Sequence, residues 1–363
     1  MNKVNKILVF PADTKAAKEI VNALKHRQFF TLASGLESLE DYNYLNEFIK
    51  NNGIDFIYPA SEEACLFLSK NQDKVNAGII SSPYETIKIC SSVDKTFNHL
   101  AGHGFEMDLG LSPDGMEDHE ITIDCFTDRH GVLRLAKKRS CSLDELGSTT
   151  WKIEPIDKEL ADMASKINLC LTFRGAWYFQ INTDGKLARI FPLIAGEMGL
   201  VRNTGINLPY LSVLDLLDKD VKIIENLCDI MLSVSDCYTY RLSIMYNHVY
   251  VDFDDTLIVK GKVNAVLIMF IYQAINAGKK IYLLTRHKED IYCSLDKYQI
   301  SPKLFTKIYH IAEQPKSDYI KDSDSIFIDD SFPELNEVKQ KLGIPVFNVD
   351  MVESLVWGFN DEF

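Results

Sequence analysis

The sequence predicts a mixed α/β protein built from three regions, residues 1–90, 91–245 and 246–363. Two observations predict α/β structure at both ends. Short apolar runs alternate with amphipathic stretches through the first ninety residues, and the same rhythm returns after His248. A third observation sets the middle region apart, because apolar and polar residues alternate there around tight turns, as in antiparallel strands. We therefore expect parallel sheets with flanking helices at both ends and an α+β region between them.

The first region follows a βαβαβ order that resembles the front half of a doubly wound sheet. Ser61 precedes Glu62 and Glu63 and is a typical N-cap, so a helix is expected to begin there and run through Ser69. No GxGxxG motif follows the first strand, which disfavours a dinucleotide-binding site. The other expected elements are strands at 6–10, 29–33, 55–59 and 78–80, and helices at 14–25 and 39–51.

The middle region contains two predicted hairpins. The turns at 128–131 and 183–185 both contain an Asp and a Gly, residues that favour tight turns. A long helix is expected after them, at 213–233, and a boundary at Tyr246–Asn247. The hairpin strands are expected at 120–128 and 132–139, and at 176–182 and 186–191.

In the third region the α/β rhythm is expected to give another parallel sheet. Strands are predicted at 248–252, 280–284, 307–311 and 325–329, and helices at 263–276 and 289–297.

The amino-acid composition limits the classes of partner that the protein is expected to bind. Thirty-nine basic and 52 acidic residues give a net charge of −13, which repels nucleic acids and acidic membrane surfaces. The negative charge does not exclude a small anionic ligand, because a bound divalent cation makes the electrostatic potential at its site positive. Residues 263–275 are too short for a membrane span of roughly 20 residues, and eight scattered cysteines fit reduced thiols. We expect a soluble, cytoplasmic protein without zinc.

Polar residues stand at the ends of the predicted strands of the third region. Asp252 and Asp254 form a DxDxT pattern after the first strand, and Thr285 ends the second. Lys316 comes next, and Asp329-Asp330 end the last strand. Because the carboxyl ends of parallel strands meet in one crevice, these side chains are expected to converge.

Each of these patterns alone has an ordinary explanation. A DxDxT is usually a solvated turn or a helix cap, and Leu257 stands where an EF-hand requires Gly. A Thr, a Lys or an Asp pair after a strand is usually a strand end, a surface charge or a cap. Their occurrence together, in order, favours a site.

Residues 246–363 resemble the haloacid dehalogenase (HAD) superfamily of phosphotransferases, whose four motifs match these residues in order, and the short spacings resemble its capless type. The resemblance implies that Asp252 is a nucleophile that forms an aspartyl-phosphate, and that Asp254 is the general acid and base. Thr285 would bind a phosphoryl oxygen, and Lys316 would neutralise charge in the transition state.

The same resemblance implies a magnesium site. Asp329, Asp252 and the backbone carbonyl of Asp254 would hold Mg²⁺. Asp330 would support these ligands or replace one of them. The resemblance adds Thr256 as a further supporting residue, and Arg286 lies beside Thr285, where it could contact substrate.

Residues 1 to about 215 are similar to the ATP-grasp ligases of the carbamoyl-phosphate synthetase and biotin carboxylase type. The residues that carry the similarity are 55–59, 61–63, 94–95, 120–124, 180–182, 184–185 and 205–207.

Two departures from the ATP-grasp pattern stand out. Only 24 residues separate Lys95 from Glu120, which is too few for the nucleotide lid. Arg189, Phe191 and Leu193 replace a metal-binding ExNPR motif, although Glu197 and Asn203 nearby offer oxygen atoms. The similarity therefore implies a truncated, degenerate domain that serves as scaffold, lid or specificity element.

Together these patterns predict a Mg²⁺-dependent phosphatase, a phosphoric monoester hydrolase acting on a small phosphorylated metabolite. A sugar phosphate or a nucleotide-sugar intermediate of polysaccharide biosynthesis is the first substrate class considered. An ATP-grasp-type ligase resembling carbamoyl-phosphate synthetase, and a non-catalytic binding or assembly module, are the alternatives. A homodimer is expected, with no nucleic acid and no membrane partner. The substrate stays open, as does whether the N-terminal region covers the site in cis or in trans.

Overall fold

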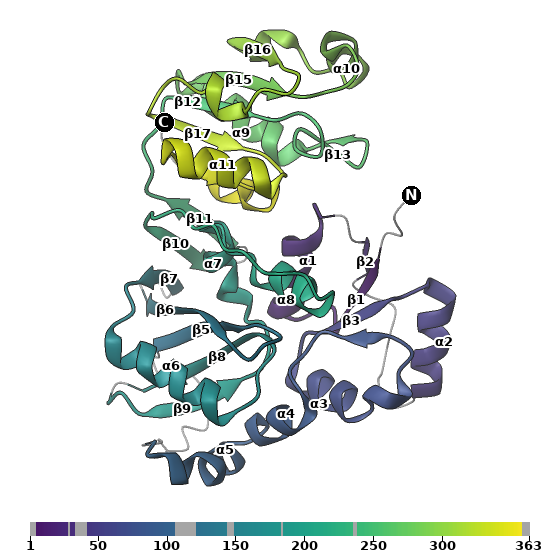
Figure 1. Ribbon diagram of the computed structural model, residues 1–363, viewed down its shortest axis with the longest axis vertical. Helices are drawn as coiled ribbons and strands as arrows, with labels where there is room; N and C mark the ends of the chain where they lie inside the picture. Colours follow the sequence, from purple (N-terminus) through teal and green to yellow (C-terminus); the bar gives the residue numbers. More distant parts are fainter. Residues whose placement is uncertain are drawn as a thin grey trace. The chain divides into compact units, whose positions relative to one another are not determined.

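The protein is described by a computed structural model that covers residues 5–27, 30–32, 42–105, 121–143, 149–182, 184–234 and 238–357 (Figure 1). The chain divides into two compact units. The first unit comprises residues 1–202, 207–222 and 231–238, and the second comprises 203–206, 223–230 and 239–363. The boundaries of the three regions expected from the sequence stay predictions.

The first unit contains two sheets with helices around them. Its strands are β1 (Lys6–Phe10), β2 (Phe30–Leu32), β3 (Phe56–Pro59), β4 (Gly78–Ile79), β5 (Ile121–Thr127), β6 (Leu133–Leu143), β7 (Thr149–Glu154), β8 (Gly175–Ile181), β9 (Leu187–Phe191) and β10 (Ile230–Val234). Its helices are α1 (Lys15–Leu24), α2 (Tyr42–Asn52), α3 (Glu62–Lys70), α4 (Tyr84–Cys90), α5 (Val93–Leu100), α6 (Lys158–Cys170), α7 (Gly199–Asn203) and α8 (Leu208–Leu216).

The first sheet is parallel, with strand order β2-β1-β3-β4. Its helices begin where the sequence places capping residues. The hydroxyl of Ser61 accepts a hydrogen bond of 3.2 Å from the backbone N–H of Ala64, which satisfies a donor at the start of α3. The predicted βα order of the first ninety residues is confirmed here.

The second sheet is antiparallel, and β10, β7, β6, β5, β8 and β9 follow one another across it. Both predicted hairpins are present, as β5–β6 and β8–β9. Trp177 and Phe179 of β8 are fully buried in the core that this sheet shares with α6. The mixed α/β fold with parallel and antiparallel sheets is therefore confirmed.

The second unit is organised around a parallel sheet, with strand order β16-β15-β12-β17-β18. Strand β11 (Tyr238–Leu242) spans the boundary between the units. The other strands are β12 (His248–Val251), β13 (Ile258–Val259), β14 (Lys262–Val263), β15 (Lys280–Thr285), β16 (Lys307–His310), β17 (Ser325–Ile328) and β18 (Val346–Phe347). The helices are α9 (Ala265–Asn276), α10 (Ile291–Lys297) and α11 (Phe332–Leu342), with 3₁₀ turns η5 (Lys316–Tyr319) and η6 (Val349–Leu355).

Alternation along the strands gives this parallel sheet two buried faces. Val249 and Val251 of β12 pack with α9 and α10 in one core cluster. Tyr250, between them, packs with Leu335 and Val338 of α11 in another. The sheet is therefore covered on both sides, and the polar strand ends lie at its edge.

The predicted helix at 213–233 is wrong. Helix α8 ends at Leu216, and Asp218 adopts the left-handed conformation, with φ of 56°. The end of the predicted segment forms β10, in which Met231 pairs with Lys152 of β7. The apolar residues of this segment have helical spacing, but pairing with β7 makes its end a strand. Such pairing cannot be predicted from the periodicity of the sequence.

None of the described helices is both long enough and apolar enough to cross a membrane.

Candidate functional site

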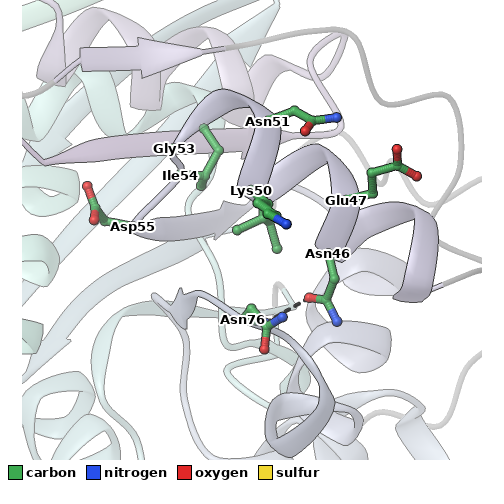
Figure 2. A pocket seen from close by; sticks show the side chains of 9 residues that line it. Asn46, Glu47, Lys50, Asn51, Gly53, Ile54, Asp55 and Asn76 are labelled. Carbon is green, nitrogen blue, oxygen red and sulfur yellow. Dashed lines mark hydrogen bonds between the residues drawn. The ribbon is translucent and has the colours of Figure 1, made fainter.

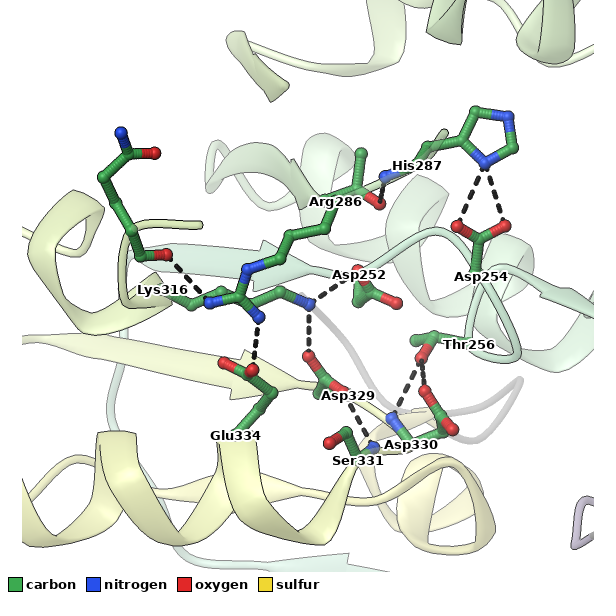
Figure 3. Close-up of polar contacts among 12 residues, drawn as sticks. Asp252, Asp254, Thr256, Arg286, His287, Lys316, Asp329, Asp330, Ser331 and Glu334 are labelled. Carbon is green, nitrogen blue, oxygen red and sulfur yellow. Dashed lines mark hydrogen bonds and ion pairs between the residues drawn. The ribbon is translucent and has the colours of Figure 1, made fainter. Parts of the chain in front are cut away.

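The polar residues that follow the strands of the second unit converge at one edge of its sheet (Figure 3). Strand β12 pairs with β17 so that Val251 lies beside Ile328. Asp252 and Asp329 are the next residues of these two strands, so their carboxylates lie side by side. Both are buried, with 5% and 1% of their surface exposed. Thr285, at the end of β15, is fully buried beside them.

Lys316 connects the two carboxylates. It begins η5, and its side chain enters the sheet edge, where 4% of the residue stays exposed. Its Nζ donates hydrogen bonds of 2.7 Å to Oδ1 of Asp252 and 2.6 Å to Oδ2 of Asp329. An ammonium group has three hydrogens, so one donor is left for another partner.

Asp330 completes an acidic cluster. Carboxylate oxygens of Asp252, Asp329 and Asp330 lie within 4.8 Å of one another. Thr256, which is buried, accepts a 3.0 Å hydrogen bond from the backbone N–H of Asp330 and donates to its carboxylate at 3.4 Å. The oxygen-only donor set fits Mg²⁺, which prefers carboxylate ligands. Three carboxylates face a single ammonium, so the cluster also lacks the positive charge that a divalent cation supplies.

The electrostatics of the cluster reflect this imbalance. Burial, and then the charge of Asp252, raise the pKa of Asp329 to about 8, against the opposing effect of Lys316. Burial and the charges of Asp252 and Asp255 raise the pKa of Asp330 to about 6. Burial opposes ionisation of Lys316, yet the charges of Asp329 and Asp252 raise the pKa of its ammonium. The lysine therefore keeps its proton, and the carboxyl groups keep theirs to unusually high pH.

These shifts predict how stability depends on pH when no metal is present. The pKa of Asp329 is higher in the folded protein than in the unfolded chain, where it is near 3.8. The folded state therefore binds more protons, and the free energy of unfolding should fall as pH rises from about 4 to about 8. Thermal unfolding in a chelator across this range measures the slope. Asp329→Asn should flatten it, and an unchanged slope in that variant would contradict the assignment.

The side chain of Asp254 turns away from the cluster (Figure 3). Its carboxylate oxygens lie 2.9 and 3.0 Å from Nδ1 of His287, and Nε2 of that histidine lies 2.7 Å from Oγ of Ser294 on α10. Thr285 accepts a 3.2 Å hydrogen bond from the backbone N–H of His287. Asp254 thus belongs to a separate hydrogen-bonded chain at the rim of the site.

Arg286 is also held in place. Its guanidinium pairs with Glu334 and donates a 2.8 Å hydrogen bond to the backbone carbonyl of Gln314. Arg286 directly follows the end of β15, so a second cation stands at the carboxyl end of this sheet.

The sequence did not assign partners to Asp254 and Arg286. Ser294 and Glu334 lie on helices that the strand-end argument does not include. His287, two residues after Thr285, was the one available signal for the contact with Asp254.

In the first unit, the residues that replace the ExNPR motif form contacts among themselves and with α3. Nη2 of Arg189 donates to both carboxylate oxygens of Glu62, at 3.0 and 2.7 Å, and its guanidinium lies 4.5 Å from the ring centre of Phe191. Phe191 stacks on Tyr178. Glu197 accepts a 3.3 Å hydrogen bond from Tyr238. A guanidinium already paired with a carboxylate offers no metal ligand.

The short stretch between Lys95 and Glu120 cannot be followed in full, because residues 106–120 lie outside the described ranges. Asn203 is the last residue of α7 and the first that belongs to the second unit, where its amide donates a 3.3 Å hydrogen bond to Glu353.

The first unit also has a surface pocket of about 790 Å³, lined by α2, by the segment 53–55 that precedes β3, and by Asn76 (Figure 2). Asn46 accepts a 2.8 Å hydrogen bond there from the backbone N–H of Asn76. Lys50, Asn51 and Asp55 also line it. Among the described residues, the group of metal-ligating side chains lies in the second unit and not in this pocket.

No protein-family model and no curated protein sequence matches the chain. Solved structures do. A complete pyruvate carboxylase from Rhizobium etli matches with a TM-score of 0.49 and 15% identity over 64% of this chain, and the match spans about a quarter (26%) of that protein. Biotin carboxylase from Campylobacter jejuni, described as a β-γ-ATP complex, matches with a TM-score of 0.48 and 11% identity, over 63% of this chain and 75% of that one.

The biotin carboxylase domain of 2-oxoglutarate carboxylase from Hydrogenobacter thermophilus matches with a TM-score of 0.47 and 12% identity, over 63% of this chain and 74% of that one. That structure is a dimer with MgADP, ADP and bicarbonate. At these identities the similarity concerns the fold.

This comparison contradicts the predicted HAD superfamily phosphatase. The matching structures are ATP-dependent carboxylase domains and not phosphoric monoester hydrolases, so they agree better with the alternative, an ATP-grasp-type enzyme. The family assignment, the hydrolase activity and the phosphomonoester reaction are therefore corrected. The motifs did not identify the reaction for a physical reason. Acidic residues and a lysine at the ends of parallel strands indicate which ligands can bind there, but the same arrangement can serve many reactions.

The comparisons do not test the roles of the individual site residues. No comparison addresses Asp252, Asp254, Thr285, Lys316 or Asp329, and the roles assigned to them stay predictions.

Proposed function

We propose that the second unit binds Mg²⁺ together with the phosphate group of a small molecule. The observation that carries this proposal is the buried cluster of Asp252, Asp329 and Asp330 with Lys316 between two of its members. Asp252, Asp329 and Asp330 would hold the ion, and the ion would supply the positive charge that draws an anion to an acidic protein.

The choice of metal follows from the ligand atoms. Hard oxygen donors suit Mg²⁺, whereas zinc favours nitrogen and sulfur ligands. Among the described residues, the metal-ligating group at this site contains neither histidine nor cysteine. Mg²⁺ also keeps several waters or ligand oxygens when few carboxylates hold it, which leaves room for a phosphate.

The choice of phosphate follows from the neighbouring donors. Lys316 has a third ammonium hydrogen, and the buried hydroxyl of Thr285 has a hydrogen to donate. Arg286, partly exposed at the rim, would face a second anionic group of the ligand. Such donors near the cluster favour an anion with several acceptor oxygens.

The proposal assigns no nucleotide site to the first unit. Arg189 and Glu62 neutralise each other where an ATP-grasp enzyme would bind its metal. Assembly as a homodimer accompanies the proposal as its less specific part.

Titration calorimetry with inorganic phosphate tests the function directly. We expect the full-length chain to bind phosphate when Mg²⁺ is supplied and to lose that binding in excess chelator. Arg189→Met serves as a control, since it removes a cation of the first unit and should leave the titration unchanged. Phosphate binding that persists in chelator, or that disappears in Arg189→Met, would refute the proposal.

A further inference from the structure

The rim of the site contains a hydrogen-bonded chain that runs from Asp254 through His287 to Ser294. The imidazole of His287 is largely buried, with 13% of its side chain exposed, and both ring nitrogens have partners. Its ring also packs edge-on against Phe253, with centroids 4.8 Å apart. The ring is therefore fixed in position by packing and by two polar contacts.

The partners also fix where the ring hydrogen lies. An ionised carboxylate only accepts hydrogen bonds, so Nδ1 must carry a hydrogen toward Asp254. The hydroxyl of Ser294, which is 5% exposed, can then donate to Nε2 at 2.7 Å. This arrangement gives each of the three groups a hydrogen-bond partner.

The charge of Asp254 matters to the cluster. It is among the influences that raise the pKa of Asp252, so the two carboxylates interact electrostatically. More than half of the Asp254 side chain is exposed, and packing alone does not restrain it. His287 contacts this carboxylate in its outward-turned position (Figure 3).

We propose that His287, held by Ser294, is a positioning residue that keeps the carboxylate of Asp254 away from the bound anion. The inference rests on the proposed function, because it concerns the anion at the same site. Without His287, the carboxylate can rotate toward the cluster, where its negative charge repels a phosphate.

Calorimetric titration of inorganic phosphate, with Mg²⁺ present, tests this role in the full-length chain. We expect His287→Ala to weaken phosphate binding roughly five- to tenfold while Mg²⁺ affinity stays within about twofold. His248→Ala is the matched control. That histidine also contacts an aspartate through Nδ1, at 3.0 Å from Asp324, but it lies at the opposite end of β12.

Two further variants separate positioning from a general structural effect. The amide nitrogen of asparagine is two bonds from Cβ, as Nδ1 of histidine is, whereas that of glutamine is three bonds away. His287→Asn should therefore retain phosphate affinity, and His287→Gln should lose it as His287→Ala does. In an Asp254→Asn background, His287→Ala should have almost no further effect, because the charge it controls is gone.

The outcomes distinguish this inference from the proposed function. If the wild-type chain binds no phosphate with Mg²⁺, the proposed function fails first. If the wild type binds and His287→Ala does not weaken binding, the positioning role is wrong. An effect of His287→Ala that persists undiminished with Asp254→Asn would also overturn it.

Discussion

Asp329→Asn is expected to weaken Mg²⁺ binding by at least about a hundredfold, since even residues that merely support metal ligands are worth about 10- to 100-fold. The substitution removes the most buried carboxylate of the cluster and keeps its shape. Because the pKa of Asp329 is raised to about 8, its ionised form is a cost to the folded protein at that pH. The metal-free variant should therefore be no less stable than the wild type near pH 8.

Calorimetry with Mg²⁺ and thermal unfolding in chelator measure the two effects. Asp296→Asn, an exposed aspartate on α10, is the control and should change neither. A variant that binds Mg²⁺ as the wild type does would exclude Asp329 as a ligand.

Lys316→Met should have the largest effect on stability. It leaves Asp252 and Asp329 buried without their shared ammonium, and removing one partner of a buried ion pair typically costs about 3–5 kcal/mol in free energy of unfolding. The loss should be smaller near pH 5, where protonation removes the uncompensated charge, because the pKa of both carboxyl groups is already raised. Saturating Mg²⁺ should restore part of the stability.

Urea unfolding at both pH values, with and without Mg²⁺, measures this. Lys341→Met provides the comparison, because Lys341 is an exposed residue that pairs with the partly buried Glu337 on α11, and its removal should matter little. Equal losses in the two variants would mean that Lys316 does not neutralise the buried carboxylates.

Much of the fold followed from local pattern. The hairpin β5–β6 and the cap at Ser61 depend on residues close together in the chain, and both were predictable. The segment after α8 was not, because Asp218 ends the helix and β10 pairs with a strand about eighty residues earlier in the chain. Pairing between strands so far apart in the sequence produces no periodic pattern in either segment from which it could be predicted.

Part of the candidate site could also be predicted from the sequence, and part could not. Asp252, Thr285 and Asp329 converge because each follows or ends a parallel strand, and the rule for strand ends places them without a structure. The contact of His287 with Ser294 depends on how α10 packs, which the spacing of the two residues did not indicate. The reaction could not be inferred either, since motif order describes a ligand environment and the comparisons contradicted the family it suggested.

The central claim is that Asp252, Asp329 and Asp330 bind a divalent cation. Mn²⁺ accepts the same oxygen ligands as Mg²⁺ and scatters X-rays anomalously, so crystals of the full-length chain grown with Mn²⁺ locate the ion directly. We predict an anomalous peak among these three carboxylates, with Lys316 still beside Asp252 and Asp329. Mn²⁺ bound elsewhere, with this cluster empty, would contradict the account.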